Sequence, residues 1–395
     1  MAFYLALASR GCGSLQIKAM KKLREKRLGL IVNPVAGIGG RVGLKGSDGA
    51  EIQKRALELG AVPQSLNRAI QALERIASAK DELEVITYPG EMGEDAARAC
   101  GFEPTVVGAI EPGETTAEDT RNAAQDMARL EVDLLLFAGG DGTARDIYNA
   151  VGEKLPALGI PAGVKIHSAV FGTSPRSAGD LALSYLRGRA SNLRGAEVMD
   201  IDEEAFRQGV VSAKLYGYLK IPFRTNLVQS LKMASSPGEA ASLGAIAYDV
   251  VEKMEDDCLY IIGPGTTTRA ITAELGLDKT LLGVDVLLNR ELIAADVGEA
   301  QLLKLLDGRR AKVIVTLIGG QGYIFGRGNQ QISPKVIKKV GRDNIVVVST
   351  TEKLHSLGRR PLWVDTGDRE VDEMLCGYIT VVTGYNERAI RKVTC

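Results

Sequence analysis

The sequence lacks the features by which nucleic-acid-binding proteins are usually detected. Lysine and arginine number 49, and so do aspartate and glutamate, so no net positive charge is present to attract a polyanion. Aromatic residues make up only 5% of the chain, which leaves few side chains for stacking on bases. We therefore expect small molecules, and no nucleic acid, as binding partners.

Cysteine and histidine are also scarce. The five cysteines are far apart and form no C-x-x-C pair, which excludes a zinc knuckle or a disulfide framework and is typical of a reducing, cytoplasmic location. The two histidines, His167 and His355, are too few for a histidine-rich metal site. Any metal is expected to be a hard cation bound by oxygen, and Mg²⁺ fits, but no ligand for it is assigned.

Long apolar runs are missing as well. Residues 3–8 are apolar, but they are too short to span a bilayer, and no basic residue precedes them as in a signal peptide. Met20 is an alternative start, because the basic segment 21–24 leads directly into the first predicted strand. We treat residues 1–27 as an N-terminal extension and a candidate for disorder, and we expect no membrane partner.

What the chain does contain is an alternation of strands and helices. Its 395 residues predict two domains. Apolar runs predict strands at 28–33, 83–87, 105–109, 134–138 and 157–160, with helical patterns over 50–80, 116–129 and from 143 onward. This alternation predicts an α/β fold: a three-layer domain with a parallel sheet over 28–170. Residues 171–395 are expected to form a second, mixed α/β or β-rich domain that closes the active-site cleft, with the boundary within 163–175.

The most informative segment is residues 138–146, AGGDGTARD. A buried strand ends here and a helix begins, so backbone N–H groups and the helix N-terminus can bind phosphate oxygens. An acid beside a polyanion is costly unless it accepts a proton or helps to place a metal. We therefore interpret Asp141 as the catalytic residue and Gly139, Gly140, Gly142 and Thr143 as phosphate-binding, against the alternative of a plain β-turn.

A second glycine-rich loop follows the first predicted strand. Asn33 ends that strand, and Gly37, Gly39 and Gly40 suit a phosphate-binding nest. The pattern is neither G-x-G-x-x-G nor a Walker loop, and a flexible surface loop is the alternative. Ligands of parallel sheets bind at the carboxyl ends of strands, and both loops lie there.

Several further residues are candidates for substrate binding. Lys45 and Asp48 lie in the same glycine loop, where a solvated turn is the alternative, and Lys165 and His167 follow a strand at the expected crevice. The segment 263–269 repeats the order strand, glycine turn, helix, so a second phosphate site is one reading and an ordinary helix N-cap the other. Its candidates are Gly265, Thr266 and Thr267. The glycine cluster at 319–329 either closes over the ligand or forms a hairpin.

Together, N-P-x-x-G-x-G after the first strand and G-G-D-G-T after a later one resemble the superfamily of NAD kinases and diacylglycerol kinases. The strings LIVNPVAGIGGRVGLKGSDG, GIPAGVKIHSAVFGTSP and GGQGYIFGRGNQQIS are similar to the ATP-NAD kinase family, in a branch related to the acetoin catabolism protein X. The resemblance runs from about residue 28 onward.

The resemblance implies phosphoryl transfer from ATP or polyphosphate, with Mg²⁺, to the 2′-hydroxyl of the adenosine ribose of NAD. It implies that Asp141 takes the hydroxyl proton, that the glycines and Thr143 hold phosphates, and that Asn33 lies nearby. A homo-oligomer is expected. The sequence departs from NAD kinases in one respect. NAD kinases carry an Asn-Glu pair soon after the glycine motif, which holds the dinucleotide. The one Asn-Glu pair of this sequence, Asn386-Glu387, comes far too late in the chain to match it. A kinase of another hydroxyl compound or lipid, and a non-catalytic nucleotide sensor, are therefore kept as alternatives.

Overall fold

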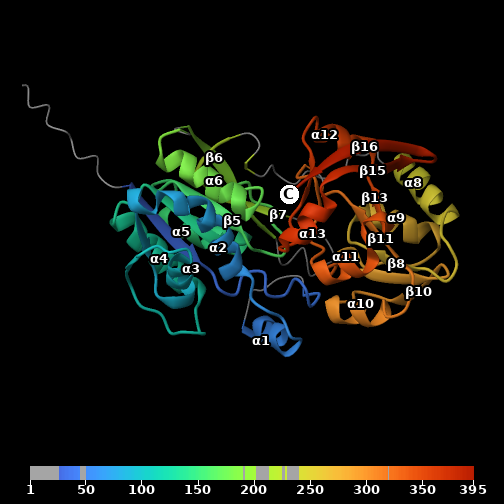
Figure 1. Cartoon of the computed structure of the whole chain (residues 1–395), viewed down its shortest axis with the longest axis horizontal. Coiled ribbons are helices and arrows are strands. Elements are labelled where there is room, and N and C mark those ends of the chain that lie inside the picture. Colours follow the sequence, from blue (N-terminus) through green and yellow to red (C-terminus); the bar gives the residue numbers. More distant parts are fainter. Residues whose placement is uncertain are drawn as a thin grey trace, which may run out of the picture.

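The computed structural model describes residues 26–44, 50–189, 192–201, 213–224, 227–228, 240–318 and 320–395. Lys45 and Asp48 lie outside the described residues, as does the N-terminal extension up to residue 25. Figure 1 shows two bodies side by side along the long axis, the first coloured blue to green and the second yellow to red. Among the described helices, none is both long enough and apolar enough to cross a bilayer.

The first body is built on a parallel sheet with helices on both faces. In the described residues this sheet has five strands in the order β3-β2-β1-β4-β5. The strands are β1 (Lys26–Val32), β2 (Leu83–Thr87), β3 (Thr105–Val106), β4 (Leu134–Gly139) and β5 (Ala157–Pro161). All six residues of β4 are buried, because the strand is covered on both faces. The predicted α/β class and parallel sheet are confirmed.

Helices connect these strands. They are α1 (Ala50–Glu58), α2 (Ser65–Ile76), η1 (Ala77–Glu82), η2 (Gly90–Met92), α3 (Glu94–Ala99), α4 (Ala117–Arg129), α5 (Asp141–Val151) and α6 (Pro175–Leu186). The helix predicted over 50–80 is thus divided into three. The helix α2 packs against α6, and α4 packs against α5. Right-handed crossovers place the two pairs on opposite faces of the sheet.

The strand order has one functional consequence. The chain moves outward from β1 to β2 and β3, then returns to β4 on the other side of β1. The sheet therefore has its topological switch point between β1 and β4, where ligands of open parallel sheets bind. Asn33 follows β1 and Gly140 follows β4, so both predicted loops begin at this switch point.

An antiparallel hairpin of β6 (Leu193–Ile201) and β7 (Ala213–Pro222) packs on the first body. Its residues Val198, Leu219 and Ile221 are buried in the same hydrophobic cluster as β1 and β4. That cluster extends along the chain from Leu28 to Val228.

The second body contains a mixed sheet, which in the described residues has nine strands in the order β10-β9-β8-β11-β13-β15-β16-β14-β12. Its strands are β8 (Leu259–Ile262), β9 (Asp285–Leu288), β10 (Glu291–Ala294), β11 (Ala311–Thr316), β12 (Tyr323–Phe325), β13 (Ile345–Val348), β14 (Leu362–Val364), β15 (Gly377–Gly384) and β16 (Glu387–Thr394). The helices are α8 (Ala240–Glu252), α9 (Thr266–Glu274), α10 (Glu299–Leu305), α11 (Pro334–Val340), η4 (Arg342–Asn344), α12 (Thr351–Ser356) and α13 (Arg369–Leu375).

Candidate functional site

The two loops at the switch point are joined directly. Asn33 donates from Nδ2 to Thr143 Oγ1 at 3.0 Å, and its Oδ1 accepts from the N–H of Val35 at 3.2 Å. The Thr143 hydroxyl also accepts from the N–H of Gly140 at 3.4 Å. Thr143 is buried, so these contacts use its side chain to hold the protein together. The structure thus brings the two predicted phosphate loops together, with Thr143 as their link.

Glycine is required at two positions by close packing. A Cβ atom on Gly139 would lie 2.4 Å from Thr143 Oγ1. Gly37 has φ of +76°, and a Cβ atom there would lie 2.0 Å from the carbonyl oxygen of Ala162. Of the other predicted phosphate-binding glycines, Gly39 and Gly40 are buried and Gly142 lies in the first turn of α5. Close packing between segments of the protein therefore explains why residues 37 and 139 are glycines, without a bound phosphate.

The carboxylate of Asp141, the first residue of α5, is already bonded. Oδ2 accepts from the N–H of His167 at 2.7 Å, and Oδ1 accepts from the N–H of Ser168 at 3.0 Å. His167 Nδ1 lies 3.1 Å from Oδ2. Asp141 is 6% exposed and His167 5% exposed. Two residues predicted from separate motifs are therefore paired, and Asp141 holds the segment 166–168 in place.

The segment 162–168 connects the switch point to the second body. Ala162 and Gly163 both donate to the carbonyl oxygen of Gly139, at 2.9 and 3.1 Å. On its other side, the carbonyl oxygen of Val164 accepts from the N–H of Gly328 at 3.0 Å and from Gln330 Nε2 at 2.8 Å. Gln321 Nε2 donates to the carbonyl oxygen of Ile166 at 3.0 Å. Residues 321–330 of the glycine cluster therefore dock on the first body.

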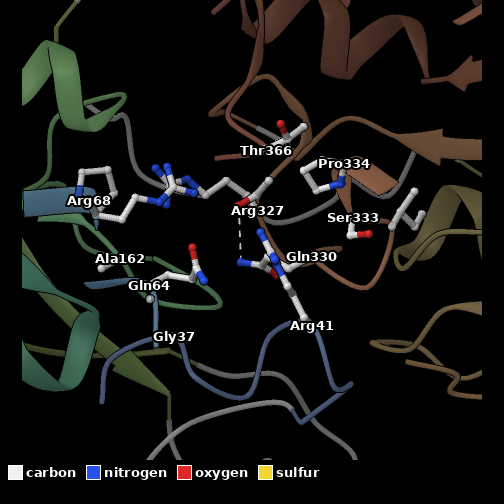
Figure 2. A pocket seen from close by; sticks show the side chains of 14 residues that line it. Gly37, Arg41, Gln64, Arg68, Ala162, Arg327, Gln330, Ser333, Pro334 and Thr366 are labelled. Carbon is white, nitrogen blue, oxygen red and sulfur yellow. Dashed lines mark hydrogen bonds between the residues drawn. The ribbon is translucent and has the colours of Figure 1, made fainter. Parts of the chain in front are cut away.

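A cavity lies where the two bodies meet, and Figure 2 shows its lining. Gly37 and Gly163 contribute from the first body, beside the loops described above. Three arginines also line it: Arg41 and Arg68 from the first body and Arg327 from the second. The described lining residues include no acid and no aromatic side chain. The remaining lining residues are Gln64, Pro161, Ala162, Gly326, Gln330, Ile332, Ser333, Pro334 and Thr366.

Asp365 is not among the described lining residues, but it pairs with two of these arginines. Arg68 Nη1 is ion-paired with Asp365 Oδ1, and Arg327 Nη2 donates to Oδ2 at 3.2 Å. Arg327 and Asp365 are 3% and 5% exposed. Arg68 and Asp365 are 297 residues apart in the chain, so this ion pair bridges the two bodies.

The remaining predicted residues lie elsewhere. Lys165 is half-buried and adjoins Gly328, and it is not among the described residues that line the cavity. Gly265, Thr266 and Thr267 begin α9 at the carboxyl end of β8, also apart from that lining. Lys353 Nζ donates to Thr267 Oγ1 at 2.9 Å. Asn386 lies in the turn between β15 and β16 and donates its N–H to Asp249 Oδ1 at 2.8 Å.

The described residues do not provide a ready metal site. They contain no group of three or more His, Cys, Asp or Glu side chains arranged to hold a metal ion. Two carboxylates near the cavity, Asp141 and Asp365, are bonded to backbone N–H groups and to arginines, respectively. The described residues therefore do not fit a Mg²⁺ ion held by three or more such protein ligands.

Sequence patterns did not identify Arg41, Arg68 or Gln330. The glycine cluster 319–329 is the one signal that points to this part of the site, through Arg327. Arg68 lies on an amphipathic helix, where nothing in the local pattern separates it from a solvent-facing arginine.

Two family models match the chain. One is described as the ATP-NAD kinase N-terminal domain and matches residues 28–190, and the other as the ATP-NAD kinase C-terminal domain and matches residues 255–393. No curated protein matches the chain.

Solved structures give weaker likenesses. Two structures, each titled as a putative diacylglycerol kinase from Bacillus anthracis str. Sterne, are 17% identical, with TM-scores of 0.25 and 0.24. Each match covers 45% of this chain and 46% of the other, so the chain spans less than half the length of these structures.

Proposed function

Because the chain belongs to the ATP-NAD kinase family, we propose that it is a kinase that phosphorylates the 2′-hydroxyl of the adenosine ribose of NAD to give NADP. The donor is ATP or inorganic polyphosphate. The reaction breaks the terminal P–O bond of the donor phosphoanhydride, forms a P–O bond to the ribose oxygen, and transfers the hydroxyl proton to a base. The observation that carries the proposal is the position of Asp141, which begins α5 at the switch point beside a cavity lined by arginines.

Asp141 is the proposed base. Its carboxylate oxygens accept from the N–H groups of His167 and Ser168. Oδ1 keeps a second lone pair, which can accept a hydrogen bond from the acceptor hydroxyl. Phosphoryl transfer needs mainly positioning and charge neutralisation, which arginines and backbone amides supply. No step is assigned to a protein-held metal.

A second candidate is a nucleotide-binding protein that performs no transfer. The hydrogen bonding of Asp141 favours it, because a carboxylate with both oxygens bonded to backbone N–H groups is explained by a purely structural role. The acceptor also stays open, because Asn386-Glu387 comes far later in the sequence than the NAD-holding Asn-Glu pair of NAD kinases.

One experiment separates these readings. The full chain is incubated with NAD, Mg²⁺ and either ATP or polyphosphate, and NADP is measured by mass spectrometry. Formation of NADP with ATP or polyphosphate supports the proposal and identifies the donor. Binding of NAD or ATP without any product after long incubation supports the non-catalytic reading. If a panel of other hydroxyl compounds is phosphorylated and NAD is not, the acceptor is wrong and the kinase assignment stands.

A further inference from the structure

Arginines line the cavity between the two bodies. Arg68 and Arg327 share the carboxylate of Asp365, and a second acid, Asp372, interacts electrostatically with Arg68. Arg41 adds a further positive charge to the lining. Within the described residues, Arg41 has no side-chain hydrogen-bond or ion-pair partner. Because Arg41 is half-buried and has no partner, an anionic ligand would complete this arrangement.

Two buried polar atoms at the cavity also lack partners. Among the described residues, neither Arg327 Nε nor Gln330 Oε1 has a hydrogen-bond partner, although both atoms are buried. A buried donor that is left unbonded costs free energy, and an oxygen ligand would remove that cost at Arg327. Figure 2 shows Arg68 and Arg327 extending toward one another across the space between the bodies, with Arg41 and Gln330 beside them.

The lining favours phosphate groups over a nucleoside. The guanidinium group presents a planar set of donors that matches phosphate oxygens. No aromatic side chain is present among the described lining residues to stack on a base.

The cavity is also adjacent to the proposed reaction centre. Gly163 lines it, and a Cβ atom on Gly163 would lie 2.8 Å from Gly140 Cα, one residue before Asp141. We propose that Arg41, Arg68 and Arg327 bind the phosphoanhydride chain of the phosphoryl donor. This inference rests on the proposed function, to which it adds the residues that hold the donor. Because Arg68 belongs to the first body and Arg327 to the second, a bound chain would bridge the two.

The test uses tripolyphosphate as the probe, titrated by calorimetry into the full chain at low salt. The informative variant is Arg41→Gln, because it removes a positive charge without breaking an interaction between described residues. Loss of one charge-assisted contact to phosphate is expected to raise the Kd of tripolyphosphate by about 10- to 100-fold. The matched control is Arg129→Gln on α4, whose side chain is 72% exposed and pairs with Asp126 of the same helix.

The outcomes divide as follows. Weaker binding in Arg41→Gln with unchanged binding in Arg129→Gln supports the site. An unchanged Kd in Arg41→Gln, or no binding of tripolyphosphate to the unmodified chain, overturns it. Displacement of tripolyphosphate by NAD, with equal weakening of NAD binding in Arg41→Gln, also overturns it, because the arginines would then hold the acceptor's pyrophosphate. Tighter binding of ATP than of tripolyphosphate identifies a nucleotide donor, and equal binding identifies polyphosphate.

The readout does not depend on turnover, so the two proposals fail separately. If no NADP forms but Arg41→Gln weakens tripolyphosphate binding, the NAD kinase reaction is wrong and the phosphate site stands. If NADP forms and Arg41→Gln leaves the KM of the donor unchanged, the reaction stands and the arginine site is wrong.

Discussion

Asn33 and Thr143 are joined by a hydrogen bond of 3.0 Å between Nδ2 and Oγ1, which links the ends of the two central strands at the switch point. The bond closes the gap between β1 and β4 just beyond their last paired residues, Val32 and Ala138. Two motifs separated by 110 residues therefore form one structural unit.

This unit predicts a coupled loss of stability. Asn33→Ala and Thr143→Val should each lower the free energy of unfolding by about 1–2 kcal/mol, because each removes a hydrogen bond and leaves a partner unbonded. The double variant should lose less than the sum, since both changes remove the same bond. Denaturant unfolding of the four proteins measures the coupling, with the exposed Asn122→Ala as a control. Strictly additive losses would contradict the link.

Asp141→Asn should affect both local structure and activity. An amide has one oxygen, so the variant can accept only one of the two backbone N–H bonds, and its NH₂ group faces the other donor. We expect faster hydrogen exchange at His167 and Ser168, measured by NMR or mass spectrometry. In an active kinase, kcat should fall by about 10²- to 10⁴-fold.

The matched control is Asp146→Asn, a buried acid of the same helix that pairs with Arg121. It should leave exchange at residues 167 and 168 unchanged. Faster exchange in Asp141→Asn with near-normal kcat would show that Asp141 positions the segment 166–168 and is not the base.

A buried lysine predicts a dependence of stability on pH. Lys279 Nζ lies 3.7 Å from Asp285 Oδ2, both side chains are 0% exposed, and burial lowers the pKa of Lys279 to about 8. The unfolded chain, in which the pKa is near 10.5, binds more protons between these values. Stability therefore rises as the pH increases from about 8 to 10.5, and this contribution is lost as the pH falls through 8.

Lys279→Met removes this titration. Relative to that variant, the unmodified chain should gain at most about 3 kcal/mol of unfolding free energy between pH 7.5 and 10.5. Denaturant unfolding at a series of pH values measures the difference. The exposed Lys335→Met serves as a control and should follow the unmodified chain. Parallel pH curves for the unmodified chain and Lys279→Met would show that Lys279 does not titrate in this range.

The C-terminal cysteines should form a disulfide under oxidation. Cys376 Sγ and Cys395 Sγ lie 3.0 Å apart although the residues are 19 positions apart in the chain. Burial is the main reason that the pKa of Cys376 is raised to about 12, so its sulfur is expected as a thiol in a reducing medium. Diamide should take the two thiol hydrogens and leave a chain lighter by about 2 Da, because thiolate attack joins neighbouring sulfurs.

Peptide mapping should then recover residues 376 and 395 in one crosslinked product. Cys376→Ser should abolish that product, and Cys100→Ser should not. Retention of both thiols under diamide would show that the two sulfurs do not meet in solution.

Much of the first body could be predicted from the sequence. The strands at residues 83–87 and 134–138 agree with β2 and β4. The continuous apolar run of β4 is buried throughout, as expected for a central strand of a parallel sheet. The strand predicted at 105–109 is reduced to two exposed residues, Thr105 and Val106, at the edge of the sheet. The second body was predicted less completely, because strands as short as β12 and β14 carry too few residues to show a period.

The sequence by itself determined that Asp141 lies between a buried strand and a helix, in a glycine-rich turn at the carboxyl edge of a parallel sheet. Those features are local, since they depend on an apolar run and on residues within a few positions of it. Only the tertiary structure decided that the Asp141 carboxylate bonds to residues 167 and 168, and that Arg68 meets Arg327 across Asp365. These contacts join segments up to 297 residues apart, and they depend on how the two bodies pack, which no local pattern specifies.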